Sequence, residues 1–235
     1  MKKIFMVLLL AMVTGLFSCI NSLNPLITYG NVESFDAATG LWKDGDGTYI
    51  KIERFRNSSI EREFNMQTKA GDKNAKPPSE EETKLENNVY ILTFNKNNIQ
   101  HYMILSFARL NDHLFAQLEP LMARDESTKM NDAVPATQKK PAPVNLWDLG
   151  KDHTYSFAKV EMNNGQLQFI PLDEDYLEGL LDKGAVAIPF EKDDWFSTTL
   201  ITASPDQLEK FFFKYGSDEK VFNKKHTLVL KPAAL

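Results

Sequence analysis

Two groups of carboxylates, Asp173-Glu174-Asp175 and Asp193-Asp194, are the residues whose types and spacing could support acid–base catalysis. A glycosidase-type hydrolase would need two carboxyl groups facing each other about 5–9 Å apart across its substrate. The first group stands where a helix is expected to begin, and acidic residues are favoured there by the helix dipole. We interpret both groups as solvated charge and expect no catalytic residues.

Metal-binding patterns are also incomplete in this sequence. The four histidines, His101, His113, His153 and His226, lack the spacing of a metal-binding motif. Asp44-Gly45-Asp46-Gly47 begins like a calcium-binding loop, but Phe55 stands where such a loop needs a bidentate Glu. A hairpin turn accounts for this segment better. The sequence therefore predicts no metal and no cofactor.

Length, composition and charge place the chain among ordinary globular proteins. It has 235 residues, of which 43% are hydrophobic and 25% are charged, so it is long enough to bury a core of its own. The formal net charge of −5 argues against nucleic acid as a partner, because phosphate binding needs a concentrated surface of Lys and Arg. No Walker loop, Gly-x-Gly-x-x-Gly or Gly-x-Ser-x-Gly motif is present.

The single cysteine lies at the end of an apolar N-terminal segment. Lys2 and Lys3 precede the run from Ile4 to Phe17, which is too short for a comfortable membrane span. The run ends in Leu16-Phe17-Ser18-Cys19, which resembles a bacterial lipobox, although Phe17 departs from the usual small or aliphatic residue. The resemblance implies that residues 1–18 are removed as a lipoprotein signal peptide, that Cys19 receives a diacylglyceryl group and that its new amine is acylated. The alternative is a buried free thiol in an ordinary cleaved signal peptide.

The residues after Cys19 bear on where the protein is delivered and how it is held. Ile20 replaces the Asp of inner-membrane retention signals, and no acidic run follows that would resemble a surface-export signal. The resemblance therefore implies lipid anchoring at the periplasmic face of the outer membrane of the cell envelope. Residues 19–38 are too apolar for a free linker, and we expect this lipidated tether to pack on the body.

Residues 39–235 are expected to form a single β-rich domain. Short segments of β-formers recur at hairpin spacing, with turn residues at Asn95-Lys96-Asn97-Asn98, Asn111-Asp112 and Asn163-Asn164-Gly165. This pattern predicts an antiparallel barrel or sandwich of about ten strands. A faint likeness between residues of about 36–122 and 146–232 leaves open two half-repeats joined by a Pro-rich loop.

Two or three short helices should interrupt the strands. Ser204-Pro205-Asp206-Gln207 is a capping box, followed by an apolar stripe at Leu208, Phe211, Phe212 and Tyr215. Residues 173–183 form a second candidate helix and residues 58–69 a weaker third. The polar segments 65–88 and 123–145 are interpreted as loops.

Two further resemblances concern the body. Gly40-Leu41-Trp42 resembles the Gly-x-Trp start of lipocalin-like barrels, in which the Trp closes the barrel floor. The whole chain resembles a group of uncharacterised outer-membrane lipoproteins of Bacteroidetes-type bacteria. That likeness lies in the opening from Ser18 to Leu26, the Gly40-x-Trp42 strand and the run from Leu200 to Gly216. It implies a location and no reaction.

The leading hypothesis is a membrane-anchored, non-catalytic binding or structural module for a small apolar ligand. The candidate ligand-binding residues are Trp42, Tyr49, Trp147 and Tyr155, because each begins or precedes a strand where a barrel mouth or floor would lie. One alternative is a protein-interaction or inhibitor subunit that docks through a loop or sheet edge. A carboxylate-based hydrolase is the third.

Overall fold

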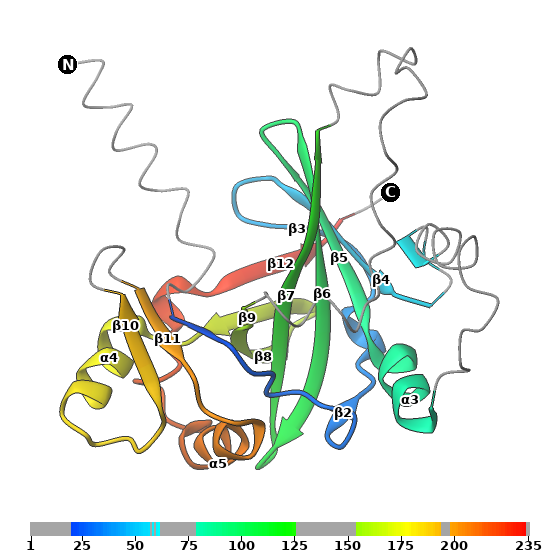
Figure 1. Cartoon of the computed structure of the whole chain (residues 1–235). Helices are drawn as coiled ribbons and strands as arrows, with labels where there is room; N and C mark the ends of the chain where they lie inside the picture. The colour runs from blue at the N-terminus through cyan, green and yellow to red at the C-terminus, as the bar shows by residue number, and fades with distance from the viewer. Residues whose placement is uncertain are drawn as a thin grey trace, which may run out of the picture.

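The centre of the molecule is a closed, eight-stranded antiparallel barrel (Figure 1). The computed structural model describes residues 20–56, 58, 60–61, 79–125, 154–193 and 198–233. The barrel strands are β3 (Gly40–Lys43), β4 (Tyr49–Arg54), β5 (Tyr90–Lys96), β6 (Ile99–Leu110), β7 (His113–Asp125), β8 (Ser156–Asn163), β9 (Gln166–Pro171) and β12 (Leu228–Pro232). Each strand pairs with its neighbours along the chain, and β12 pairs with β3 to close the ring. The prediction of a mostly β, antiparallel fold is confirmed, as a barrel rather than a sandwich.

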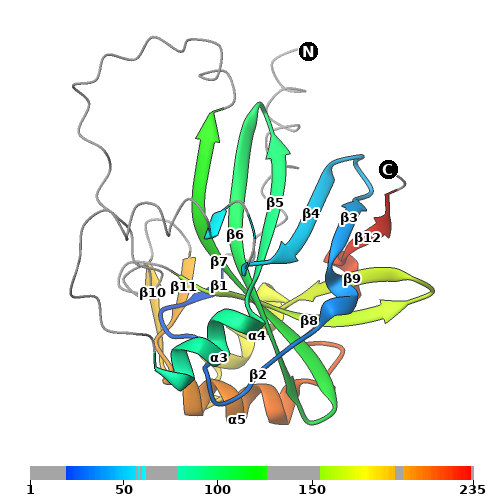
Figure 2. The same cartoon turned by 90° about the vertical axis from the view of Figure 1, so that its right-hand side faces the viewer.

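Tight turns made by local residue types join three pairs of barrel strands. Asn97 and Asn98, Asn111 and Asp112, and Asn164 and Gly165 all have positive φ angles. A type I′ turn needs positive φ at both central residues, and its twist matches that of the flanking strands. β6 and β7 are thereby paired along most of their length, and with β5 they rise beyond the rest of the barrel (Figure 2).

The inward-facing side chains fill the barrel. On β6, Met103, Leu105 and Phe107 point inward, whereas Tyr102 and Ile104 point outward, as the two-residue period of a strand requires. The inward positions of the other strands complete one buried cluster: Trp42, Ile50, Ile52, Tyr90, Leu92, Leu114, Ala116, Ala158, Val160, Leu167, Phe169 and Leu230, with Ala38 from outside the strands.

An insertion between β9 and β12 builds a lobe against the outside of the barrel (Figure 1). It comprises α4 (Glu174–Asp182), β10 (Phe190–Asp193), β11 (Thr198–Ile201), α5 (Pro205–Tyr215) and the 3-10 helix η4 (Lys224–His226). Both helices lie where the sequence predicts them, and α5 begins with the expected reciprocal capping box between Ser204 and Gln207. The lobe buries Leu208, Phe211 and Phe212 against outward-facing residues of the barrel.

The segment before the barrel runs over its outer surface. β1 (Ile20–Ser22) pairs in parallel with β11, and β2 (Val32–Glu33) pairs with the end of β6. Ile20, Leu26, Ile27 and Val32 are buried. The 3-10 helix η1 (Asp36–Ala38) then leads into β3.

The interpretation of residues 65–88 as a loop is wrong at its end, where α3 spans Glu80–Asn88. Leu85 is the only large apolar residue of this helix, so an apolar stripe was not visible in the sequence. Acidic residues in its first turn interact favourably with the helix dipole, and Leu85 packs on the outer face of the barrel. The candidate helix at 58–69 lies mostly outside the described residues.

Candidate functional site

The predicted ligand-binding residues lie in different parts of the molecule. Trp42 is inside the barrel and 6% exposed, with its indole N–H donating to the Ala38 carbonyl over 2.8 Å. Tyr49 is 54% exposed, and the Lys43 ammonium lies 5.2 Å from the centre of its ring. Tyr155 precedes β8 and belongs to a buried cluster outside the barrel. Trp147 lies outside the described residues.

Trp42 braces the segment that covers one end of the barrel. Its hydrogen bond holds η1, and the preceding Phe35 meets the inward-facing ring of Phe107 edge-on at 5.3 Å. Phe107 also meets Tyr90 at 5.4 Å. The barrel is therefore closed at this end by aromatic packing, in keeping with the floor that the Gly40-x-Trp42 motif implied.

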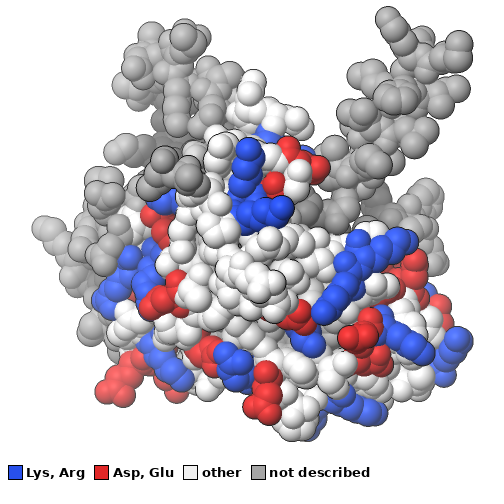
Figure 3. Space-filling model, turned by 180° about the vertical axis from the view of Figure 1, so that it is seen from behind, with Lys and Arg blue, Asp and Glu red and all other residues white. Residues whose placement is uncertain are grey.

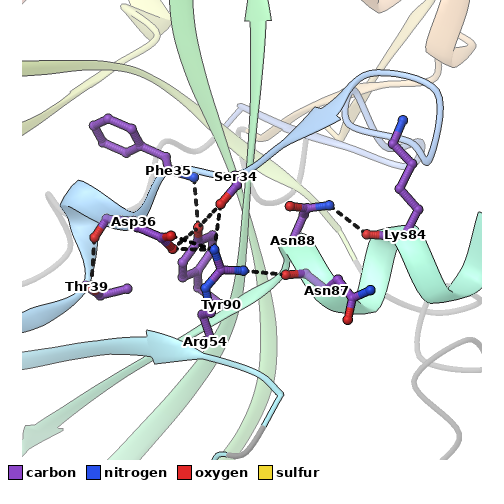
Figure 4. A network of polar contacts seen from close by, with 9 residues as sticks. All are labelled: Ser34, Phe35, Asp36, Thr39, Arg54, Lys84, Asn87, Asn88 and Tyr90. Atoms are coloured by element: carbon purple, nitrogen blue, oxygen red, sulfur yellow. Dashed lines mark hydrogen bonds and ion pairs between the residues drawn. The ribbon is translucent and has the colours of Figure 1, made fainter.

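A polar network secures this closure (Figure 4). Arg54 donates to Asp36 and to the Ser34 hydroxyl, each over 2.7 Å, and to the Asn87 carbonyl at the end of α3 over 2.6 Å. The Tyr90 hydroxyl donates to Asp36 over 3.1 Å and accepts from the backbone N–H of Phe35 over 2.8 Å. Arg54 thus joins the barrel wall, residues 34–36 before η1 ends, and α3.

The network should make a small, pH-dependent contribution to stability. The Arg54 hydrogen bond lowers the pKa of Asp36 below its ordinary value of 3.8. A lowered pKa stabilises the fold above that ordinary value, and the contribution is lost as the pH falls through the folded-state pKa. Because Asp36 is 61% exposed, we expect less than about 1 kcal/mol. Urea unfolding of Asp36→Asn should show a deficit at pH 6 that disappears near pH 2; an equal deficit at both values would contradict the prediction.

A pocket of about 300 Å³ lies on the outer surface of the barrel. One wall is the outward face of β6 and β7, and the segment of residues 25–29 and the helix α3 form the others. Its lining is mostly apolar: Pro25, Ile27, Thr28, Tyr29, Phe55, Leu85, Glu86, Val89, Ile104, Ser106, Gln117, Glu119 and Tyr155. Its volume is at the small end of the range for small-molecule sites.

Buried polar groups stand on the strand wall of this pocket. Ser106, Gln117 and Glu119 are 4%, 5% and 8% exposed. In the strand register Gln117 lies opposite Ser106, and Glu119 lies opposite Ile104. Oε1 of Gln117 accepts the backbone N–H groups of residues 26 and 27 over 2.8 and 2.9 Å. Gln117 therefore holds residues 25–29 in place, and the pocket wall that these residues form is part of the fold.

Tyr155 enters the pocket from the far side of β7. Its backbone pairs with Ser22 through hydrogen bonds of 2.9 and 2.8 Å, which places it beside β1. Burial, and secondarily the negative charge of Glu119, raises the pKa of Tyr155 to about 12. The phenol is therefore neutral at physiological pH and can exchange hydrogen bonds with a bound molecule.

Two of the other residues that the sequence singled out, Asp173 and Asp44, have structural partners. Asp173 is the N-cap of α4, accepting from the Tyr176 backbone N–H over 2.9 Å, and it also accepts from Asn223 over 2.8 Å. Oδ1 of Asp44 accepts the backbone N–H of Thr48 over 2.7 Å, so this aspartate closes the β3–β4 turn as expected. In the described ranges, no three His, Cys, Asp or Glu side chains come together in an arrangement that could hold a metal.

Tyr155, which the sequence singled out, lines this pocket, whereas the other lining residues were not singled out. Gln117 and Glu119 interrupt an apolar strand at alternate positions, a pattern that is typical of a solvent-facing strand surface. Residues 25–29 lie over that surface and bury it. A contact between residues so far apart along the chain leaves no local pattern in the sequence. Comparisons with protein-family models, curated proteins and solved structures found no match to this chain. The barrel is consistent with a lipocalin-like body.

Proposed function

We propose that this protein is a membrane-anchored, non-catalytic binding module that holds a small, mostly apolar molecule in the pocket on the outside of its barrel. The pocket itself carries the proposal: it combines an apolar lining with a few buried polar groups on a rigid sheet. That combination is typical of sites that bind small molecules.

The outer pocket is a better site than the barrel interior. The inward side chains already form one buried cluster that includes Tyr90, Phe107 and Trp42, and side chains packed at the density of a protein core leave little room for a ligand. The pocket, by contrast, offers about 300 Å³. On the face shown in Figure 3, Lys and Arg are interspersed with Asp and Glu, so this face does not present the concentrated positive charge that a polyanion needs.

The proposed location is the periplasmic face of the outer membrane, with Cys19 carrying the lipid. It rests on the lipobox-like sequence before Cys19. Within the described ranges, the helices are too short or too polar to cross a bilayer. Ser22 is bonded to Tyr155 through its backbone, so the anchor would lie only a few residues from the pocket, where apolar molecules of the membrane are within reach.

A substitution that fills the pocket with a larger side chain should weaken the binding of a ligand. The body from residue 20 onward is titrated with 1-octanol, followed by calorimetry and by the rise in melting temperature that any ligand of the folded state produces. Ser106→Phe places a large ring in the pocket and should weaken binding about tenfold or more. Tyr49→Ala, at an exposed position of β4, is the control and should bind like the unmodified body.

The same variants distinguish the two places where a ligand could sit. If Tyr49→Ala or Trp42→Phe abolishes octanol binding while Ser106→Phe leaves it intact, the ligand occupies the barrel mouth and the proposal is wrong. If no variant and no apolar probe gives saturable binding, the pocket is not a ligand site.

A further inference from the structure

Three buried side chains on the pocket wall carry polar groups to which the described fold gives no partner. Ser106, Gln117 and Tyr155 line the pocket, and each is at most 7% exposed. In the part of the chain that the structure describes, the hydrogen bonds of these side chains are the two that Oε1 of Gln117 accepts from residues 26 and 27. Buried polar groups normally have a hydrogen-bond partner. The pocket wall can therefore supply hydrogen bonds to an occupant.

The three groups lie next to one another on the outer face of the barrel. Ser106 on β6 is directly opposite Gln117 on β7, a pairing in which the two Cβ atoms are about 5 Å apart. Gln117 pairs in turn with Phe157 on β8, so Tyr155, two residues earlier, lies diagonally from it. Ser106 and Gln117 are therefore close enough to contact the same atom of a ligand.

The chemistry of Gln117 and Ser106 specifies an acceptor on the ligand. Two backbone N–H groups bond to Oε1 of Gln117 and so fix the orientation of its amide. The free end of that side chain is then the NH2 group, which can only donate. The Ser106 hydroxyl can donate a second hydrogen bond. A carbonyl oxygen accepts two hydrogen bonds and brings no donor of its own that would need a partner in the pocket.

We propose that the ligand is an uncharged carbonyl compound, a ketone or an ester with an apolar body, whose carbonyl oxygen accepts from the Gln117 amide and the Ser106 hydroxyl. This inference rests on the proposed function and adds a chemical class to it. The apolar body would lie among Ile27, Val89 and Ile104, which are buried on three different segments around the pocket. A carboxylate would instead give up its hydration to a mostly apolar lining in exchange for two uncharged donors.

Tyr155 is the other donor that a carbonyl oxygen could meet in this pocket. Burial raises the pKa of its phenol to about 12, so the hydroxyl keeps its proton at physiological pH. We assign the carbonyl to Ser106 and Gln117 because these two residues are directly opposite each other, whereas Tyr155 reaches the pocket from the far side of β7.

The infrared band of a bound carbonyl tests the contact directly. The body from residue 20 onward is loaded with acetophenone that is isotope-labelled at its carbonyl carbon, and the band is compared with that of the same compound in hexane. Hydrogen bonds to a carbonyl oxygen lower its stretching frequency, so we expect a band below the hexane position. Ser106→Ala should move the band part of the way back and weaken binding about fivefold. Ser156→Ala, which removes a hydroxyl bonded to Asn21 outside the pocket lining, is the matched control and should change neither.

A second probe separates the hydrogen bonds from the fit of the apolar body. In the alkene 2-phenylpropene, a CH2 group replaces the carbonyl oxygen of acetophenone while the rest of the molecule is the same. Calorimetric titration should show that it binds Ser106→Ala at least as tightly as the unmodified body. An equal loss of affinity for both probes would mean that Ser106→Ala changes the shape of the pocket, and would overturn the assigned hydrogen bond.

The remaining outcomes separate this inference from the proposed function. A band at the hexane position, or one that Ser106→Ala leaves unchanged, would overturn the carbonyl contact and leave an apolar pocket in place. A band that moves in Tyr155→Phe and not in Ser106→Ala would overturn the assignment to the pair opposite each other. If 1-octanol binds and acetophenone does not, the carbonyl inference alone fails. If neither these probes nor 1-octanol gives saturable binding, both proposals fail.

Discussion

Replacing Phe212 with Asp should remove most of the stability of the folded protein. Phe212 is fully buried on α5, and its ring centre lies 5.1 Å from that of Phe115 and 5.2 Å from that of Phe157, both on the outer barrel wall. Truncating a buried Phe to Ala costs about 3–5 kcal/mol, and a buried carboxylate adds a desolvation cost. Natural domains are stable by only about 5–15 kcal/mol, so the lobe should detach or the protein unfold.

Phe213 provides the matched control on the same helix. It follows Phe212 directly and is 55% exposed, so Phe213→Asp should change the free energy of unfolding by no more than about 0.5 kcal/mol. Thermal melts followed by circular dichroism should show a decrease of roughly 10 °C or more for Phe212→Asp. A melting temperature for Phe212→Asp that matches the control would mean that α5 does not dock through Phe212.

The parts of the fold that the sequence predicted are those that local chemistry determines. Asn164-Gly165 adopts the positive φ angles that its hairpin turn requires, and the capping box at Ser204 begins α5. Each of these signals lies within a few residues, and each leaves little choice to the backbone. Whether the strands close into a barrel depends on the pairing of β12 with β3, which joins opposite ends of the domain and has no local signature.

Helix α3 was not predicted from the sequence because it carries little apolar surface. Glu80–Asn88 contains good helix formers, but only Leu85 has a side chain that the core can bury. Arg54 adds a second tie by donating to the carbonyl of Asn87. Both contacts are tertiary, so the sequence alone favoured a polar loop.

The candidate site was harder to predict because it forms only where residues 25–29 cover the outer face of β6 and β7. Tyr155 was selected as the start of a barrel strand, and it does line a pocket, but on the outside of the barrel and far along the chain from Gln117 and Ile27. Trp42, selected by the same reasoning, instead holds η1 at the closed end. The spacing of aromatic residues along strands could not distinguish an inward position from a covered outward one.

The proposed lipidation of Cys19 leads to the prediction with the second largest effect: if Cys19 carries the lipid, removing it should release the protein from the membrane. Ile20 directly follows Cys19, is 1% exposed and begins the strand that pairs with β11. A lipid on Cys19 would therefore be attached without a spacer to the folded body. Several acyl chains, each contributing about 0.8 kcal/mol per buried methylene, make a stable anchor.

Cys19→Ser should eliminate this anchor. Cells supplied with a clickable fatty acid should give a labelled protein in the carbonate-washed membrane fraction for the unmodified chain and no label for Cys19→Ser. The matched control joins an ordinary cleavable signal peptide to Ile20, which delivers the same body without a cysteine and should place it in the soluble periplasmic fraction. Its octanol affinity should equal that of the lipidated protein, because among the described residues, which begin at Ile20, the pocket lining starts at Pro25. An unmodified Cys19 in the mature protein, shown by mass spectrometry of its N-terminal peptide, would refute the lipid anchor and with it the proposed location.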